Sequence, residues 1–251
     1  MSVTEHGPAS HGLIPDWPAP ARVRALQTTR LGGVSAPPYA SFNLGDHVGD
    51  DPQAVASNRA ALATGLPATP LWLTQVHGTT VLDAGQPQAD RTADASVAHA
   101  PGAVCAIMTA DCLPVLLCND EGTVVGAAHA GWRGLCNGVL EATVAAMDVP
   151  GESLMAWLGP TIGRDAFEVG SDVLDAFTAH DANAARAFRP AASAGKYWAD
   201  IELLARQRLA ALGVSRVYGG GLCTVSDAER WFSYRRDRTT GRMASLIWLQ
   251  P

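Results

Sequence analysis

The chain of 251 residues contains no apolar run that approaches the roughly 20 residues a membrane-spanning helix needs. It also lacks, at its start, the basic stretch followed by an apolar stretch that marks a secretory signal. Charged residues make up only 17% of the chain, which is low for a disordered protein, and the formal net charge is −6. This acidic balance gives no overall field that would attract nucleic acid or an anionic membrane. We therefore expect a soluble, cytoplasmic protein that binds neither.

Cysteine is scarce, and its count is odd. Five cysteines in a chain without a secretory signal favour reduced thiols, so at least one of them is free to bind a metal or to act as a nucleophile. Hydrophobic residues make up 47% of the chain, which is enough for one sizeable core. We expect a single catalytic domain over residues 21–251, preceded by a poorly ordered or loosely docked arm over residues 1–20, where Pro, Gly and Ser are frequent.

Hydrophobic patterning predicts strands and helices that are mixed without strict alternation. Residues 28–50 carry turn formers throughout and predict a long functional loop with brief strands. Strands are expected at residues 71–77, 104–111, 113–119, 123–131, 154–160, 214–220 and 242–249. Helices are expected at residues 51–66, 134–147, 171–180 and 201–212. This order favours one mixed α/β (α+β) domain.

Three residues stand where predicted strands end: His77, Cys112 and His129. They are separated by 35 and 17 residues, whereas the ligands of zinc fingers come in close pairs. Zinc accepts imidazole nitrogen and thiolate sulfur, and three protein ligands leave a fourth position open for water or substrate. A lone strand-end histidine or apolar cysteine is more often structural, but each of these three has polar or glycine neighbours. The pattern therefore predicts a catalytic rather than a structural zinc site.

The segments around these residues carry a wider resemblance. In chain order they read TTRLGGVSAPPYASFNLGDHVGDD, TQVHGT, TADCLPVLL, HAGWRG, GPTIGRDAFEVG and WFSYRRDRTTGRMASLIW. From about Thr28 to the C-terminus, the chain resembles the YfiH-like family, also called laccase-domain or polyphenol-oxidase-like, whose members are described as purine nucleoside phosphorylases. The resemblance implies a mixed α/β sandwich of two sheets flanked by helices, with His77, Cys112 and His129 as zinc ligands. It also implies phosphorolysis of adenosine, inosine, guanosine and methylthioadenosine, with adenosine deamination as a further activity.

The histidine count tests the name laccase. A multicopper oxidase needs a blue-copper site and a histidine-rich trinuclear cluster, for which about ten histidines are usual. The chain has seven histidines, two of them in the N-terminal arm, and no His-X-His pair. A multicopper laccase centre is thereby excluded, although copper could still bind at the predicted zinc site.

Phosphorolysis requires an anion site, for which the planar fork of arginine is well suited. We expect Arg30 and Arg133 to bind phosphate, because Arg30 precedes two glycines and Arg133 follows His129 by four residues. The next candidates are Arg59, Arg235 and Arg236.

Amide and carboxylate side chains supply further candidates. Asn43 and Gln75 are expected to orient the ribose or the base, since amides both donate and accept hydrogen bonds. Asp111 adjoins Cys112 and is a candidate for holding a ligand in place or for acid–base work, with a distant structural role equally open. Asp94 is a weaker candidate of that kind, and His47 is expected to be an idle loop histidine.

Two other classes of function remain open. Cys112 and His129 could form a metal-free thiolate–imidazole pair that hydrolyses an amide, for example in editing peptidoglycan precursors. Alternatively, the chain could be a binding protein with a structural zinc, completed by a fourth ligand such as Cys223 or His47. The sequence favours neither over the phosphorylase, because a thiolate pair needs only one histidine. It leaves the oligomeric state open.

Overall fold

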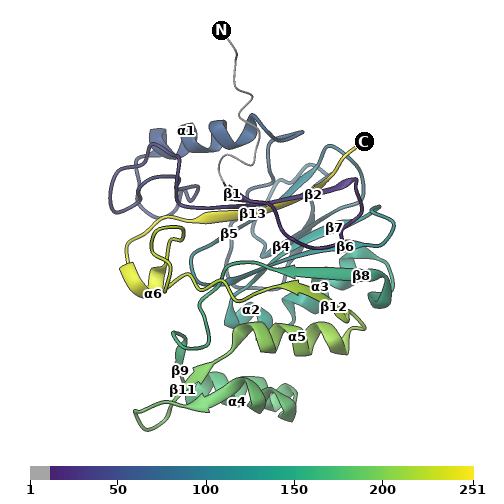
Figure 1. Cartoon of the computed structure of the whole chain (residues 1–251). Coiled ribbons are helices and arrows are strands. Elements are labelled where there is room, and N and C mark those ends of the chain that lie inside the picture. The colour runs from purple at the N-terminus through teal and green to yellow at the C-terminus, as the bar shows by residue number, and fades with distance from the viewer. Residues whose placement is uncertain (1–11) are drawn as a thin grey trace.

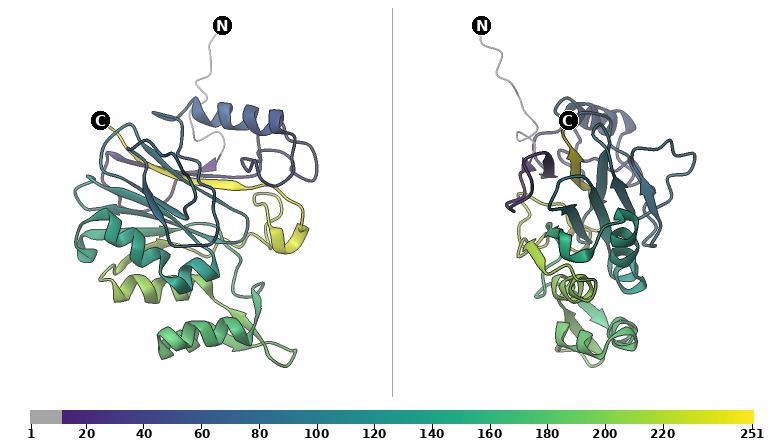
Figure 2. Two further views of the ribbon diagram at one scale, coloured as in Figure 1. Left: turned by 180° about the vertical axis from the view of Figure 1, so that it is seen from behind. Right: turned by 90° about the vertical axis from the view of Figure 1, so that its right-hand side faces the viewer.

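A computed structural model describes residues 12–251 and shows two sheets stacked face to face, with helices on both outer sides (Figure 1). The first sheet has the strand order β1-β2-β13-β5, and the second has the order β12-β8-β6-β7-β4-β3. Figure 2 shows from behind that α1 lies on one side of the stack, whereas α3 and α5 lie on the other. This arrangement confirms the predicted mixed α/β fold of one domain.

The four-stranded sheet contains strands from both ends of the described chain. Its strands are β1 (Gly12–Leu13), β2 (Val23–Thr28), β13 (Met243–Leu249) and β5 (Val104–Thr109). All of its neighbouring strands are antiparallel, with Leu246 of β13 opposite Leu26 on one side and Ala106 on the other. Helix α1 (Pro52–Ala63) covers its outer face by packing Leu62 against Val104 and Trp248.

The six-stranded sheet is the centre of the molecule. Its strands are β12 (Arg216–Gly219), β8 (Leu154–Leu158), β6 (Leu113–Asn119), β7 (Val125–Ala130), β4 (Ala95–Ala98) and β3 (Val81–Asp83). Every residue of β6 is buried, because one face packs on the first sheet and the other on the helices. A continuous apolar run such as LPVLLCN is typical of a strand buried on both faces.

The outer helices close the second core. These are α2 (Trp132–Asn137), α3 (Val139–Met147) and α5 (Ile201–Ala211), and Asp200 caps α5 by accepting a hydrogen bond from Leu203 N. A small antiparallel sheet and one helix project beyond them (Figure 1). They consist of β9 (Glu168–Gly170), β10 (Phe188–Pro190), β11 (Lys196–Ala199) and α4 (Ser171–His180). Short elements complete the fold at Gly151–Ser153, Ala182–Ala187 and α6 (Tyr234–Asp237).

Three expected elements differ from the structure. Residues 71–77 form no strand and contribute only isolated bridges from Leu71 and Thr74. The helix expected over 134–147 is interrupted at Gly138, whose φ of 103° ends α2 and begins α3. The loop over 29–50 contains no strand. At residues 71–77 the cause is hydrogen bonding of the backbone to Asp94, and at Gly138 it is the positive φ.

The predicted N-terminal arm is only partly visible. Residues 1–11 lie outside the described residues. Beyond them, Gly12 and Leu13 pair with Thr28 and Gln27 of β2, and Trp17 packs against the core between the sheets. In the described part of the chain no helix is both long and apolar enough to cross a membrane.

Candidate metal centre

His77, Cys112 and His129 converge at one point. Their ligand atoms all lie within 4.8 Å of one another, and Cys112 Sγ is 3.7 Å from His77 Nε2. Cys112 lies in the turn between β5 and β6, and His129 is the last residue but one of β7. His77 comes from the irregular segment before β3, so the expectation that a strand carries it is wrong. The three residues nevertheless converge, as the sequence pattern predicted.

Asp94 holds two of these residues in place. Its buried carboxylate accepts hydrogen bonds from the backbone N–H groups of Val76, His77 and Gly78, at 3.1, 2.9 and 2.7 Å. It also lies 2.8 Å from His129 Nδ1, which leaves the Nε2 atom of this ring free to bind a metal. The same bonds stabilise the positive φ of 61° at His77, a conformation that is uncommon outside glycine.

Asp111 anchors the third residue through the backbone. Its φ is 92°, and its carboxylate accepts hydrogen bonds from Thr224 Oγ1 and Arg235 N, both at 2.6 Å. Its carbonyl oxygen accepts from Ile162 N at 2.9 Å. Asp111 therefore fixes the turn that presents Cys112, without any hydrogen bond to the three candidate ligands themselves.

The first glycine of the HAGWRG segment, Gly131, packs directly against two of the candidate ligands. A Cβ atom at this position would lie 2.7 Å from His77 Cδ2 and 3.1 Å from Cys112 Sγ. Any larger residue would therefore press the thiol and the imidazole out of position.

The charges at the site suit a metal. Burial opposes ionisation of Cys112, but the charge of His129 and hydrogen bonds to both imidazoles lower the pKa of the Cys112 thiol to about 6. Burial likewise opposes protonation of His129, but the charges of Cys112 and Asp94 raise the pKa of His129 to about 9. Tetrahedral zinc would place a sulfur and a nitrogen ligand about 3.6 Å apart, close to the observed 3.7 Å. The donor atoms therefore fit zinc with an open coordination position.

A cavity of about 490 Å³ opens over these three residues. Its wall includes three arginines, Arg133, Arg235 and Arg242, and three aromatic side chains, Trp132, Phe167 and Tyr234. A volume of this size and a mixed lining are typical of sites for small molecules.

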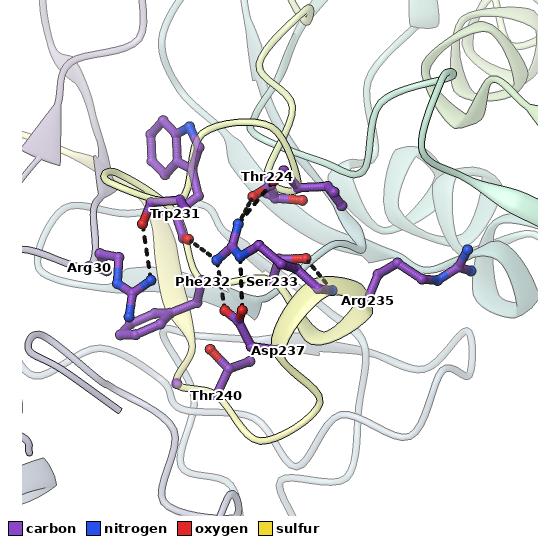
Figure 3. Close-up of polar contacts among 12 residues, drawn as sticks. Arg30, Thr224, Trp231, Phe232, Ser233, Arg235, Asp237 and Thr240 are labelled. Atoms are coloured by element: carbon purple, nitrogen blue, oxygen red, sulfur yellow. Dashed lines mark hydrogen bonds and ion pairs between the residues drawn. The ribbon is translucent and has the colours of Figure 1, made fainter. Parts of the chain in front are cut away.

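The predicted substrate residues divide into two groups. Arg133 and Gln75 line the cavity, although the Gln75 amide is bonded to the backbone N–H and C=O of Met108, both at 2.8 Å. Arg30 lies elsewhere: its guanidinium donates to the carbonyls of Ala40 and Ala228. The same guanidinium stacks over the Phe232 ring (Figure 3). Neither Arg30 nor the fully buried Asn43 belongs to the wall of the cavity.

The remaining candidates, three arginines and one histidine, also divide into residues inside and outside the cavity wall. Arg59 pairs with Asp46 at 3.1 Å and lies away from the cavity. The Arg236 guanidinium bonds to the carbonyls of Thr224 and Trp231 and to the Asp237 carboxylate, so it is structural (Figure 3). Arg235 and His47 do line the cavity.

Sequence reasoning missed Arg242, Tyr234 and Phe167. Arg242 directly precedes β13, and a charged residue at the start of a buried strand was a signal that could have found it.

Neither proposed fourth ligand joins the group. Cys223 lines a separate cavity and accepts a hydrogen bond from Gly163 N at 3.3 Å. His47 is an exposed residue 3.5 Å from Asp46. Within residues 12–251, the candidate ligand group contains only His77, Cys112 and His129.

The thiols should differ sharply in their reactivity when metal is absent. We expect iodoacetamide to modify Cys112 with a rate that reaches half of its maximum near pH 6, because the thiolate forms as the pH rises through the pKa. Cys105 and Cys118 should stay unmodified in the native protein, since both are buried and burial raises the pKa of each to about 12. Mass spectrometry of digested samples identifies each site, and Cys112→Ala gives the background from Cys223. Modification of Cys105 before Cys112 would contradict this assignment.

A stacked α/β sandwich with a His–Cys–His site under a small-molecule cavity defines an enzyme-like class of protein. The profile of the family described as "Multi-copper polyphenol oxidoreductase laccase" matches residues 24–250. A protein named purine nucleoside phosphorylase from Pseudomonas aeruginosa is 60% identical over 238 residues, covering 95% of this chain and 98% of the relative. The Escherichia coli protein named purine nucleoside phosphorylase YfiH is 58% identical over 240 residues, covering 94% and 98%.

Solved structures agree with this relationship. A Neisseria meningitidis protein assigned to the family DUF152 has a TM-score of 0.92 and 54% identity, covering 95% of this chain and 99% of its own. YfiH from Bacillus licheniformis has a TM-score of 0.83 and 29% identity, covering 91% and 93%. The chain belongs to the YfiH-like (laccase-domain) family, as its motifs indicated.

Proposed function

We propose that the chain is a zinc-dependent purine nucleoside phosphorylase acting on adenosine, inosine, guanosine and methylthioadenosine. The observation that carries the proposal is the convergence of three zinc-type ligands beneath a cavity whose wall contains three arginines that form no ion pair with any described residue. Relatives that share more than half of their residues with this chain bear the name purine nucleoside phosphorylase, which supports the reaction class.

His77, Cys112 and His129 would hold the zinc, whose chemical contribution is Lewis-acid polarisation of an oxygen atom. The arginines of the cavity hold phosphate by charge-assisted hydrogen bonds. Aromatic side chains such as Tyr234 offer flat faces for the purine and exclude water from the ribose. In the reaction a phosphate oxygen bonds to the ribose C1′ atom, the bond from C1′ to the purine nitrogen breaks, and the purine leaves with a proton.

The metal-free thiol hydrolase is the second candidate, because the pKa of Cys112 is lowered to about 6 and a neighbouring imidazole can carry the proton. Metal content separates the two candidates. Protein purified without added zinc should contain the metal if the phosphorylase proposal holds. A metal-free protein with amide hydrolase activity would favour the second candidate.

Product analysis tests the reaction directly. We expect zinc-loaded protein to convert inosine to hypoxanthine and ribose 1-phosphate in the presence of phosphate, and to make neither product without it. Adenosine should give adenine by the same route, and any inosine formed from it without phosphate would reveal deamination. If no nucleoside yields ribose 1-phosphate, the phosphorylase proposal is wrong.

We further infer that the protein works in the cytoplasm. All five cysteines are unpaired, which suits a reducing compartment.

A further inference from the structure

Seven of the fourteen arginines outside the cavity form an ion pair with a carboxylate, but none of the three arginines in the cavity wall does so within the described residues. Outside the cavity, Arg59 pairs with Asp46 at 3.1 Å and Arg236 pairs with Asp237 at 2.7 Å. Among residues 12–251, no acidic side chain forms an ion pair with Arg133, Arg235 or Arg242. Three arginines without an ion-pair partner in the described chain therefore face one space, in a protein whose formal net charge is −6.

Arg242 is the most constrained of the three. Its Nη1 atom donates to the carbonyls of Thr240 and Gly241, at 3.1 and 3.0 Å, which leaves Nη2 and Nε without a partner in the described chain. Asn43 Oδ1 accepts a hydrogen bond from Arg242 N at 2.8 Å. The stem of the arginine also packs closely on Gly45, where a Cβ atom would lie 2.8 Å from Arg242 Cγ.

This packing gives Asn43 a role different from the predicted one. Its amide fixes the backbone of Arg242 from a fully buried position rather than contacting the ribose or base. Burial lowers the pKa of Arg242, and the charges of Cys112 and Asp111 partly offset this effect, so the guanidinium lies within reach of the charges at the metal centre.

The guanidinium groups of the other two arginines are held by fewer contacts. Arg235 Nη1 donates to the carbonyls of Ala166 and Glu168 at 3.4 and 3.1 Å, and the guanidinium lies 5.7 Å from the centroid of the Phe167 ring. Its Nη2 and Nε atoms form no hydrogen bond within the described residues. The Arg133 guanidinium stacks over the Trp132 ring at 4.4 Å and forms no hydrogen bond with any of residues 12–251. The acidic group in the cavity wall beside the metal ligands, Asp111, is already occupied by Thr224 Oγ1 and Arg235 N.

We propose that Arg242, supported by Arg133 and Arg235, is the binding site for inorganic phosphate. This inference rests on the proposed phosphorylase function and replaces Arg30 as the predicted partner of Arg133. A doubly charged phosphate presents oxygen atoms on several sides, which matches guanidinium groups that come from three different segments of the chain. The planar fork of Arg242, held rigid by Asn43 and Gly45, sets the position of the anion.

The test measures phosphate binding separately from turnover. Zinc-loaded wild type, Arg242→Lys and Arg242→Met are compared by equilibrium dialysis against radiolabelled inorganic phosphate, with no nucleoside present. Arg206→Lys is the matched control, because Arg206 also donates to two backbone carbonyls, those of Val217 and Gly219, but lies outside the cavity. Zinc content and thermal unfolding without phosphate show whether each variant is folded.

We expect Arg242→Lys to weaken phosphate binding by about tenfold and Arg242→Met by more, because lysine keeps the charge but loses the fork. The KM for phosphate should rise by the same factor, whereas the KM for inosine should change less than about threefold. Phosphate should also raise the unfolding temperature of wild type and Arg206→Lys more than that of Arg242→Met.

Three results would overturn the proposal. The first is phosphate affinity unchanged in folded Arg242→Met, and the second is a wild type that binds no phosphate. The third is that the protein binds adenosine monophosphate more tightly than adenosine and loses this difference in Arg242→Met. That result would assign the guanidinium to the phosphate group of a nucleotide instead of free phosphate. If phosphate binds through Arg242 but no ribose 1-phosphate forms, the anion site stands and the proposed function fails.

Discussion

Replacing Cys112 or His129 with alanine should reduce bound zinc from one ion per chain to almost none. Three protein ligands would hold the metal in the proposed site, and the candidate ligand group in the described chain contains no fourth residue. Loss of a residue that merely orients a ligand costs about 10- to 100-fold in metal affinity, so loss of a ligand should cost more than 100-fold. Phosphorolysis should fall with the zinc content. Metal analysis after dialysis against a weak chelator measures the first effect.

Cys223→Ala is the matched control for this experiment. Cys223 is a partly exposed thiol that lies in a different cavity, so its removal should leave one zinc per chain. A loss of zinc in this variant would instead support a four-ligand structural site. Unchanged zinc in both Cys112→Ala and His129→Ala would exclude the site altogether.

The elements that the sequence predicted best are those set directly by the pattern of apolar residues. The segment LPVLLCN forms β6 with the expected bounds, because a short unbroken apolar run that ends at a turn is typical of a buried strand. Helix α5 began after the expected cap, Asp200. β4, in contrast, was missed because ASVA contains small residues with little strand preference, and only its position between β3 and β7 makes it a strand.

The failure at residues 71–77 has a physical cause at the site itself. Asp94 accepts the N–H groups of Val76, His77 and Gly78, the groups that would otherwise pair with a neighbouring strand. A local pattern cannot reveal this, because Asp94 lies 17 residues beyond His77. The convergence of His77, Cys112 and His129 could be predicted because few residue types bind zinc.

The residues of the proposed phosphate site could not be predicted in the same way. Arg30 and Arg242 look equally suitable in the sequence, and only the fold shows that Arg30 is occupied by the carbonyls of Ala40 and Ala228. Asp94, which sequence reasoning rated below Asp111, forms hydrogen bonds to two of the three candidate ligand residues, His77 and His129.

Asp94→Asn should therefore weaken zinc binding by about 10- to 100-fold while all three ligands remain in place. The asparagine amide has the shape of the carboxylate, but its NH2 group would face an N–H donor, either Gly78 N or His129 Nδ1. A buried donor left without an acceptor costs about 1–3 kcal/mol, so the free energy of unfolding should also fall. Asp83→Asn is the matched control, because Asp83 accepts one backbone N–H from Gly85 away from the site.

The effect on the metal-free protein should depend on pH in a defined direction. Burial opposes ionisation of Asp94, but hydrogen bonds from His129 and from the backbone together lower the pKa of Asp94. Its stabilisation is therefore present above its unfolded value of about 3.9 and is lost as the pH falls through the folded value. The pKa of His129 is raised to about 9, so its stabilisation is complete below its unfolded value and is lost as the pH rises through 9. The stability difference between wild type and Asp94→Asn should thus be largest at about pH 4 to 6.5, and denaturant unfolding after chelation measures it. A difference that grows above pH 9, or zinc affinity equal to that of wild type, would show that Asp94 does not position His129.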